Sequence, residues 1–257
     1  MALSWDTTTG DNDEIKGVGH NNQVNAMLTV GDEVYTVGID DCMKKFSTAS
    51  NEYSSYSLKL DSQPRALCSG GGNIIFVACM NEISITNEGQ KENSLLVKYE
   101  PNSISFNSVT CELAVGSSKE SFVYVYKVSG YNLEEITKVS VRGTPSHLAY
   151  SPNGELLAVG DSQRCLTVMA TKAYSVTLHS WSYHTARVSY LAWSPDSTYI
   201  ASGGIDSNVI LWSVADAGKK AIVKGAHPMS PVNGIVWLDN SSFVSVGSDC
   251  CTRLWDI

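Results

Sequence analysis

ASGGIDSNVILW, at residues 201–212, is the stretch that decides the fold when it is read together with His184 upstream. The same side chains return 43 residues later along the chain. His184, Ser202, Asp206 and Trp212 in the first copy become His227, Ser245, Asp249 and Trp255 in the second. Four residue types that keep four spacings define an internal repeat, and a period of this length is typical of proteins built from similar stacked units.

The spacing within the repeat suggests how its side chains meet. The unit resembles the WD repeat, an antiparallel sheet of four strands, named a to d from inside to outside, that forms one blade of a propeller. The Asp would lie in the turn between strands b and c and accept hydrogen bonds from backbone N–H groups and from the His that precedes strand a. The His would meet the Ser hydroxyl on strand b, which in turn would meet the Trp indole N–H on strand c.

We interpret this set as a fastening that holds the register of a blade. A catalytic triad is a poor alternative, because neither Ser lies in the strained G-x-S-x-G turn of a nucleophile. A partial copy earlier in the chain consists of His20, Thr36 and Asp40, with Phe46 in the place of the Trp.

Strand signals recur along the whole chain. Apolar runs that lead into turns begin at residues 24, 64, 102, 145, 188 and 232, and each is followed by a short second run before the next turn. These are expected to be the a and b strands of six blades, with no room for helices between them. The segment at residues 3–6 resembles a c strand and is followed by an expected d strand at residues 14–20.

The expected fold is therefore all-β, a WD-repeat β-propeller of the seven-bladed type that is incomplete at its first blade. It forms a single domain over residues 1–257, whose first blade begins at its c strand and whose last blade ends at its c strand. Two explanations stay open: the chain is a piece of a longer protein that begins inside a blade, or the strand at residues 14–20 closes the last blade and leaves six.

Three blades in the middle of the chain depart from the repeat. Gln163 stands where the Asp is expected and Met169 where the Trp is expected, while Lys119 and Glu120 occupy the turn before Tyr126. Such losses are tolerable, because blades are held mainly by apolar faces that pack on their neighbours.

Composition excludes several classes of protein. The formal net charge is −8, and Lys and Arg are scattered singly, which argues against nucleic acid or an anionic membrane as a partner. Seven cysteines without a C-x-x-C pair indicate free thiols in a reducing compartment. The amino terminus lacks a signal sequence and no apolar run is long enough to span a membrane, so we expect a cytoplasmic protein.

Three longer segments resemble one particular family. They are SWDTTTGDNDEIKGVGHNNQVNAM at residues 4–27, YHTARVSYLAWSPDSTYIASGGIDSNVILW at residues 183–212 and AHPMSPVNGIVWLDNSSFVSVGSD at residues 226–249. They are similar to the carboxy-terminal propeller of the actin-interacting protein 1 family, the WD-repeat cofactors of cofilin. The resemblance implies a protein of two seven-bladed propellers that binds actin and cofilin at the actin cytoskeleton and promotes disassembly of cofilin-decorated filaments.

The resemblance carries over the fastening residues but no partner contact, since the first propeller of the family is absent from this sequence. We expect the partner-binding side chains among solvent-facing residues beside the fastenings. These are Gln23, Asp41, Lys119, Glu120, Arg164, Arg187 and Ser230.

Two other classes of function compete with this interpretation. One is a generic WD-repeat adaptor, for example in a ubiquitin ligase or a trafficking complex. The other is an enzyme with a metal in a central channel, but the inner strands begin with Val, Pro, Asn or Ser, and His147 and His179 stand alone on different blades. We therefore expect no catalytic residue, no metal, no cofactor and no small-molecule substrate.

Overall fold

The computed structural model describes residues 3–6, 9–174 and 177–257. In this part of the chain every regular element is a strand, and every paired strand runs antiparallel to its neighbour. The chain divides into two compact units, residues 1–101 and 102–257, which are described separately below.

The first unit contains one short two-stranded sheet and two sheets of four strands. The short sheet pairs β1 (Leu3–Trp5) with β2 (Asn12–Glu14). The second sheet contains β3 (Val24–Val30), β4 (Glu33–Gly38), β5 (Cys42–Ser47) and β6 (Glu52–Lys59). The third contains β7 (Pro64–Gly71), β8 (Ile74–Cys79), β9 (Glu82–Asn87) and β10 (Gln90–Leu96).

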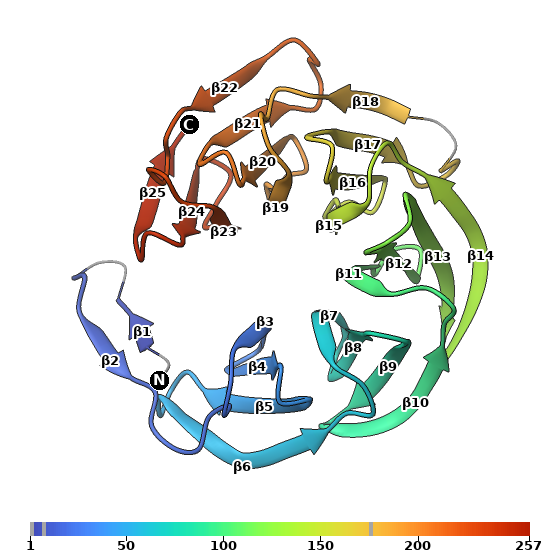
Figure 1. The fold of residues 1–257 in the computed structure, drawn as a ribbon, viewed down its shortest axis with the longest axis vertical. Coiled ribbons are helices and arrows are strands. Elements are labelled where there is room, and N and C mark those ends of the chain that lie inside the picture. The colour runs from blue at the N-terminus through green and yellow to red at the C-terminus, as the bar shows by residue number, and fades with distance from the viewer. Residues whose placement is uncertain (1–2, 7–8, 175–176) are drawn as a thin grey trace. The chain divides into compact units, whose positions relative to one another are not determined.

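The second unit contains four sheets, whose strands follow one another in chain order (Figure 1). The first is made of β11 (Pro101–Asn107), β12 (Glu112–Ser117), β13 (Phe122–Ser129) and β14 (Asn132–Ser140). The next two are made of β15 (Pro145–Tyr150), β16 (Leu156–Asp161), β17 (Leu166–Ala170) and β18 (Thr177–Trp181), and of β19 (Val188–Trp193), β20 (Tyr199–Gly204), β21 (Val209–Ser213) and β22 (Lys220–Val223). The last has three strands, β23 (Val232–Trp237), β24 (Ser242–Gly247) and β25 (Thr252–Asp256).

These sheets confirm the all-β propeller expected from the repeat. Six of them have the expected a and b strands, so the fold is that of a six-bladed propeller, and the seven-bladed type is only partly confirmed by the additional pair β1–β2. Successive sheets in each unit serve as blades, and strands a to d of a blade are its four strands in chain order.

The expected strand at residues 14–20 is wrong in its extent. The strand β2 ends at Glu14, and Lys16 instead makes a single parallel bridge with Glu52 of β6. Gly17 explains the break, because its φ of 87° lies outside the strand region. A Cβ at this position would lie 2.9 Å from the carbonyl oxygen of Tyr53, so the chain passes β6 too closely for any other residue.

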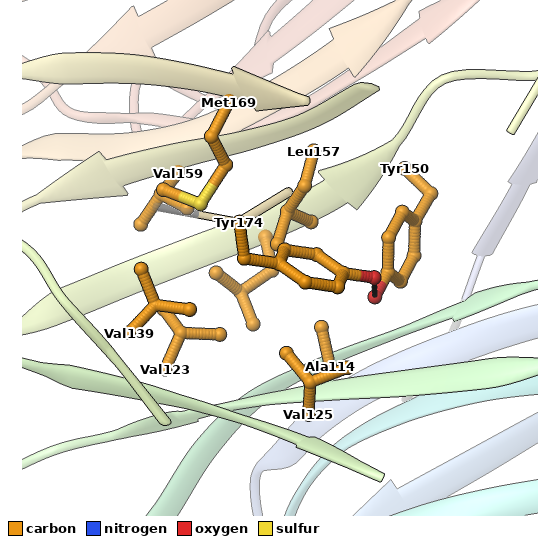
Figure 2. Packing of buried hydrophobic residues seen from close by; sticks show 10 residues of the cluster. Ala114, Val123, Val125, Val139, Tyr150, Leu157, Val159, Met169 and Tyr174 are labelled. Atoms are coloured by element: carbon orange, nitrogen blue, oxygen red, sulfur yellow. Dashed lines mark hydrogen bonds between the residues drawn. The ribbon is translucent and has the colours of Figure 1, made fainter. Parts of the chain in front are cut away.

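The core lies between the faces of neighbouring blades. Five of the six residues of β12, β16 and β20 are buried, because a middle strand is covered on both of its faces, whereas the outer strand β14 is mostly exposed. Figure 2 shows one such interface in the second unit, where Ala114, Val123 and Val125 of one blade pack against Leu157 and Val159 of the next.

The same interface contains a buried polar chain. The Tyr174 hydroxyl donates to Oε2 of Glu112 over 2.5 Å. It also lies 2.9 Å from the Tyr150 hydroxyl (Figure 2). Met169, where the repeat would have Trp, is 1 % exposed in this cluster. Apolar packing and the Tyr174 bond thus hold a blade that has lost the tryptophan of its fastening.

Candidate functional site

The first repeat copy identified in the sequence is assembled in the blade β19–β22. Nδ1 of His184 lies 3.1 Å from both carboxylate oxygens of Asp206, and Nε2 lies 2.8 Å from Oγ of Ser202. The indole N–H of Trp212 donates to the same Oγ over 2.8 Å. We call this set of His, Ser or Thr, Asp and Trp side chains the clasp.

The chemistry of the two ends sets the direction of the bonds made there. An indole N–H can only donate and a carboxylate can only accept. Oγ of Ser202 therefore accepts from Trp212, and the Nδ1–H of His184 donates to Asp206. Both ring nitrogens of His184 have partners within the blade, so neither is open to a substrate.

Asp206 is also held by the backbone of the segment that carries the histidine. Its Oδ2 accepts from the N–H of Thr185 over 2.7 Å and its Oδ1 from the N–H of Asn208 over 3.2 Å. Burial alone would raise the pKa of Asp206, but the hydrogen bonds from His184 and Thr185 outweigh it and lower the pKa to about 2. Asp206 is therefore ionised at neutral pH and ties the segment before strand a to the turn between strands b and c.

Two further clasps repeat this geometry. In the blade β23–β25, His227 lies 2.8 Å from Oδ1 of Asp249 and 2.8 Å from Oγ of Ser245, which accepts from Trp255 over 2.8 Å. Arg253 adds a contact that the sequence analysis did not include, since its guanidinium donates to Oδ2 of Asp249 over 2.7 Å.

In the blade β3–β6, Nδ1 of His20 lies 2.8 Å from Asp40 and Nε2 lies 2.9 Å from the hydroxyl of Thr36. Phe46 stands in the place of the tryptophan and is buried against Tyr53, with ring centroids 5.2 Å apart. Burial would raise the pKa of Asp40, but the hydrogen bonds from His20 and from the N–H of Asn21 lower it.

The blade β15–β18 lacks a clasp, and a different residue holds its turn between strands b and c. The sequence analysis did not identify this residue. Asp161, the last residue of β16, is buried and accepts from the N–H groups of Gly143, Gln163 and Cys165 over 3.0, 2.8 and 2.9 Å. Gln163 itself is exposed. Asp161 lies two residues before the position of the Asp in the repeat and accepts the backbone N–H groups of the turn in its place. Its signal in the sequence is an acidic residue at the end of an otherwise apolar strand.

The seven residues expected to bind a partner are distributed over both units of the chain. They lie in turns between strands b and c or in segments that lead into strand a, with Gln23 and Asp41 in the first unit and Lys119, Glu120, Arg164, Arg187 and Ser230 in the second. All are exposed except Asp41 and Ser230, which are half-buried.

Two of these candidates have internal partners. Glu120 accepts from the hydroxyl of Tyr124 over 2.6 Å, and Asp41 lies 3.3 Å from Nζ of Lys59. Arg164 has a φ of 68°, so its side chain extends from a tight turn. The backbones of Arg187 and Ser230 make hydrogen bonds within the unit. The carbonyl of Arg187 accepts from the N–H of Ile205, and the N–H of Ser230 donates to the carbonyl of His227.

The expectation that His147 and His179 lie on different blades is wrong, because both belong to the sheet β15–β18, His147 in its inner strand and His179 in its outer strand. The ring of His147 packs against that of Tyr190 with centroids 4.0 Å apart and planes tilted by 38°, and burial lowers its pKa to about 4. Nε2 of His179 donates to the carbonyl of Val214 over 2.9 Å. Within residues 3–6, 9–174 and 177–257, no three His, Cys, Asp or Glu side chains are arranged to hold a metal ion. None of the described elements is a helix of the length and apolarity needed to cross a membrane.

Comparison with known proteins agrees with this geometry. The family model described as "WD domain, G-beta repeat" matches residues 175–213 and 219–256, which include the clasps of the last two blades. Actin-interacting protein 1 of Drosophila melanogaster is 39 % identical to this chain over its whole length. The resemblance to the actin-interacting protein 1 family is therefore confirmed over the whole of this chain.

The actin-interacting protein 1 of Caenorhabditis elegans is 30 % identical over 99 % of the chain, and the 66 kDa stress protein of Physarum polycephalum is 32 % identical over all of it. The chain spans 42 % of the Drosophila protein and 43 % of each of the other two, as expected for a match to one propeller of the family. A chain of the Mitotic Checkpoint Complex superposes with a TM-score of 0.75 over 88 % of this chain and 70 % of its own length. At 19 % identity this likeness shows the fold alone.

Proposed function

We propose that this chain is an actin-binding module that assists cofilin-dependent disassembly of actin filaments without catalysing a reaction. The observation that carries the proposal is the 39 % identity to actin-interacting protein 1 of Drosophila melanogaster, which extends over every blade, including the degenerate ones. The partners are actin and cofilin, and the site of action is the cytoplasmic actin cytoskeleton.

The arrangement of the ionisable groups supports binding rather than catalysis. The side chains that most resemble catalytic residues, His184, Ser202 and Asp206, bond to one another and to Trp212, and His184 and Ser202 are buried. Loops on a rigid scaffold are the usual place for partner contacts. Because the side chains of the clasps bond to one another, the exposed turns are the surface that remains available to a partner.

The turns beside the clasps are the expected contact surface. Arg164 lies in the turn between β16 and β17, and Arg187 in the segment that leads into β19, so both lie at the same end of their strands. Lys172 and Lys219 lie in the c–d connections of the same two blades, at the opposite end. All four are exposed cations, so a charge reversal at one end of the strands can be compared with the same reversal at the other end.

The test is co-sedimentation with cofilin-decorated actin filaments. We expect the chain to pellet with the filaments, and the double variant Arg164→Glu/Arg187→Glu to lose about tenfold or more in affinity, because like charges opposed in an interface cost more than 1 kcal/mol. Lys172→Glu/Lys219→Glu should bind like the wild type. Equal losses of affinity in the two variants would contradict the turns beside the clasps as the contact surface, while leaving actin as the partner.

A longer version that also carries the first propeller implied by the resemblance distinguishes two outcomes: this propeller is insufficient for binding, or the proposed function is wrong. Binding by the longer version alone would show that this propeller is not sufficient. If neither version pellets with decorated filaments, the proposed function is wrong. Recovery of ubiquitin-ligase or trafficking subunits in place of actin would favour the adaptor interpretation.

A further inference from the structure

Two adjacent cysteines occupy the turn that carries the last clasp. Cys250 and Cys251 lie between β24 and β25, and both side chains are exposed. Cys250 has a φ of 58°, in the left-handed region. Neither thiol contributes to the apolar core, so packing does not account for their presence.

Cys251 lies among the groups that hold the clasp together. Its N–H donates to Oδ1 of Asp249 over 3.3 Å, and its thiol donates to the backbone carbonyl of Asp249 over 3.4 Å. The pKa of Arg253 is raised, first by its hydrogen bond to Asp249 and in smaller part by the neighbouring Cys251. The guanidinium of Arg253 bonds to the same Asp249 carboxylate as the N–H of Cys251, and an exposed thiol near a cation is the usual setting of a reactive cysteine.

We propose that Cys250 and Cys251 form a thiol–disulfide exchange site that is oxidised by low-molecular-weight disulfides. The Cys251 thiolate attacks one sulfur of the disulfide, its proton goes to solvent, and one thiolate of the reagent leaves. Cys250 then attacks the sulfur of Cys251 in the mixed disulfide and expels the second thiolate. Two cysteine thiols are oxidised to one Cys250–Cys251 disulfide, and one reagent disulfide is reduced to two thiols.

Oxidation changes the clasp because the same residue serves both. When Sγ of Cys251 turns to bond Cys250, its contact with the Asp249 carbonyl is lost, and the N–H bond to Oδ1 is drawn out of line. Asp249 holds His227 over 2.8 Å and Arg253 over 2.7 Å. The oxidised chain is therefore less stable in its last blade, and a reductant restores it.

The first unit contains a matched turn with a single thiol. In the turn between β4 and β5, Asp41 has a φ of 57° and the Cys42 thiol donates to the carbonyl of Asp40 over 3.4 Å. This turn has the backbone of the Cys250–Cys251 turn, with Asp41 in the place of Cys250. Lys44 occupies the sequence position of Arg253, four residues after Asp40, but its Nζ donates to the carbonyls of Val18 and Gly19. Asp41→Cys therefore tests whether the backbone of the turn is by itself sufficient for an internal disulfide.

The experiment is timed oxidation of the folded chain with glutathione disulfide, followed by peptide mass mapping. We expect the peptide with Cys250 and Cys251 to lose two hydrogens at least about tenfold faster than the exposed Cys111 gains glutathione. Cys250→Ser should stall as a glutathione adduct on Cys251, and Cys251→Ser should slow the turn to the rate of Cys111. Asp41→Cys should create a second internal disulfide with Cys42.

The readouts remain decisive if a variant fails to fold, because the wild type carries its own comparison at Cys111. A wild-type chain whose Cys251 adduct persists unresolved would refute the exchange site. So would equal rates at Cys251 and Cys111. A second readout is thermal melting, in which oxidised wild type should melt lower than reduced and recover in dithiothreitol, whereas Cys251→Ser should show neither change.

Discussion

Both ring nitrogens of the histidine in each clasp bond to another side chain of that clasp. His184 bonds to a carboxylate on one side and a hydroxyl on the other, and the indole N–H of Trp212 donates to that hydroxyl. Each bond contributes about 1 kcal/mol, so the value of the clasp lies in fixing register between three parts of a blade. The carboxylate of Asp206 contributes most to fixing this register, because it also accepts from two backbone N–H groups.

The first prediction concerns this carboxylate. Asp206→Ala should lower the free energy of unfolding by about 1 to 3 kcal/mol, because His184 and the N–H of Thr185 lose their acceptor in a buried setting. Asp41→Ala is the control, since its contact with Lys59 is a surface ion pair of little net value. Urea unfolding followed by tryptophan fluorescence measures both, and equal losses would contradict the role of the clasp.

The second prediction is a dependence of stability on pH. The pKa of Asp206 falls from an ordinary value of 3.8 to about 2 in the folded chain, so the folded state binds its proton less readily than the unfolded state. The resulting stability is present above pH 3.8 and is lost as the pH falls through 2. Urea midpoints measured from pH 5 down to pH 2 should fall less steeply for Asp206→Asn than for Asp41→Asn, which should follow the wild type.

Strands are joined across blades by ties at both ends of the inner strand. In the second unit, the hydroxyls of Ser146 and Ser189 donate to the backbone carbonyls that begin β19 and β23. At the other end, the indole N–H groups of Trp193 and Trp237 donate back to the carbonyls of Ala149 and Ala192 over 2.9 and 3.1 Å. The first unit has one such tie, from Asn25 to the carbonyl of Pro64 over 2.8 Å.

The third prediction tests these inter-blade ties. Ser189→Ala should lower the free energy of unfolding by about 1 kcal/mol, because a carbonyl between β19 and β23 loses its donor. Ser182→Ala, at an exposed site in the same unit, should change it by less than about 0.5 kcal/mol. A double-mutant cycle with Trp237→Phe measures whether the two ends of one junction act together, and strict additivity would show independent ties.

Over the whole molecule, the sequence predicted the features that repeat and missed those that occur once. A fixed spacing of 43 residues identifies the clasps of the last two blades, because they use the same residue types at the same positions. Asp161 was missed, because a carboxylate can reach the same backbone N–H groups from a different position. The end of β2 was missed, because the close approach of Gly17 to Tyr53 depends on another strand. The proposed exchange site depends on the bonds that Cys251 and Arg253 both make to Asp249, which spacing alone does not reveal.

The fourth prediction follows from the exposed apolar side chains of the last blade. Val236 of β23 and Leu254 of β25 are 61 % and 59 % exposed, and Leu238, which follows β23, is 56 % exposed. A patch of this kind beside an edge strand favours self-association. Sedimentation velocity at rising concentration should show larger species for the wild type and fewer for Val236→Lys/Leu254→Lys. Val109→Lys, at a 65 % exposed turn position in the same unit, is the control and should leave association unchanged.

The inter-blade ties also bear on how such a chain evolves. Each tie needs a particular side chain on one blade, but its acceptor is a carbonyl that all twenty amino acids supply. A blade can therefore drift, lose its tryptophan or arise by duplication without breaking the junction that its neighbour makes to it. Selection acts on one partner of each pair, which is how blades as unlike as β15–β18 and β19–β22 remain neighbours.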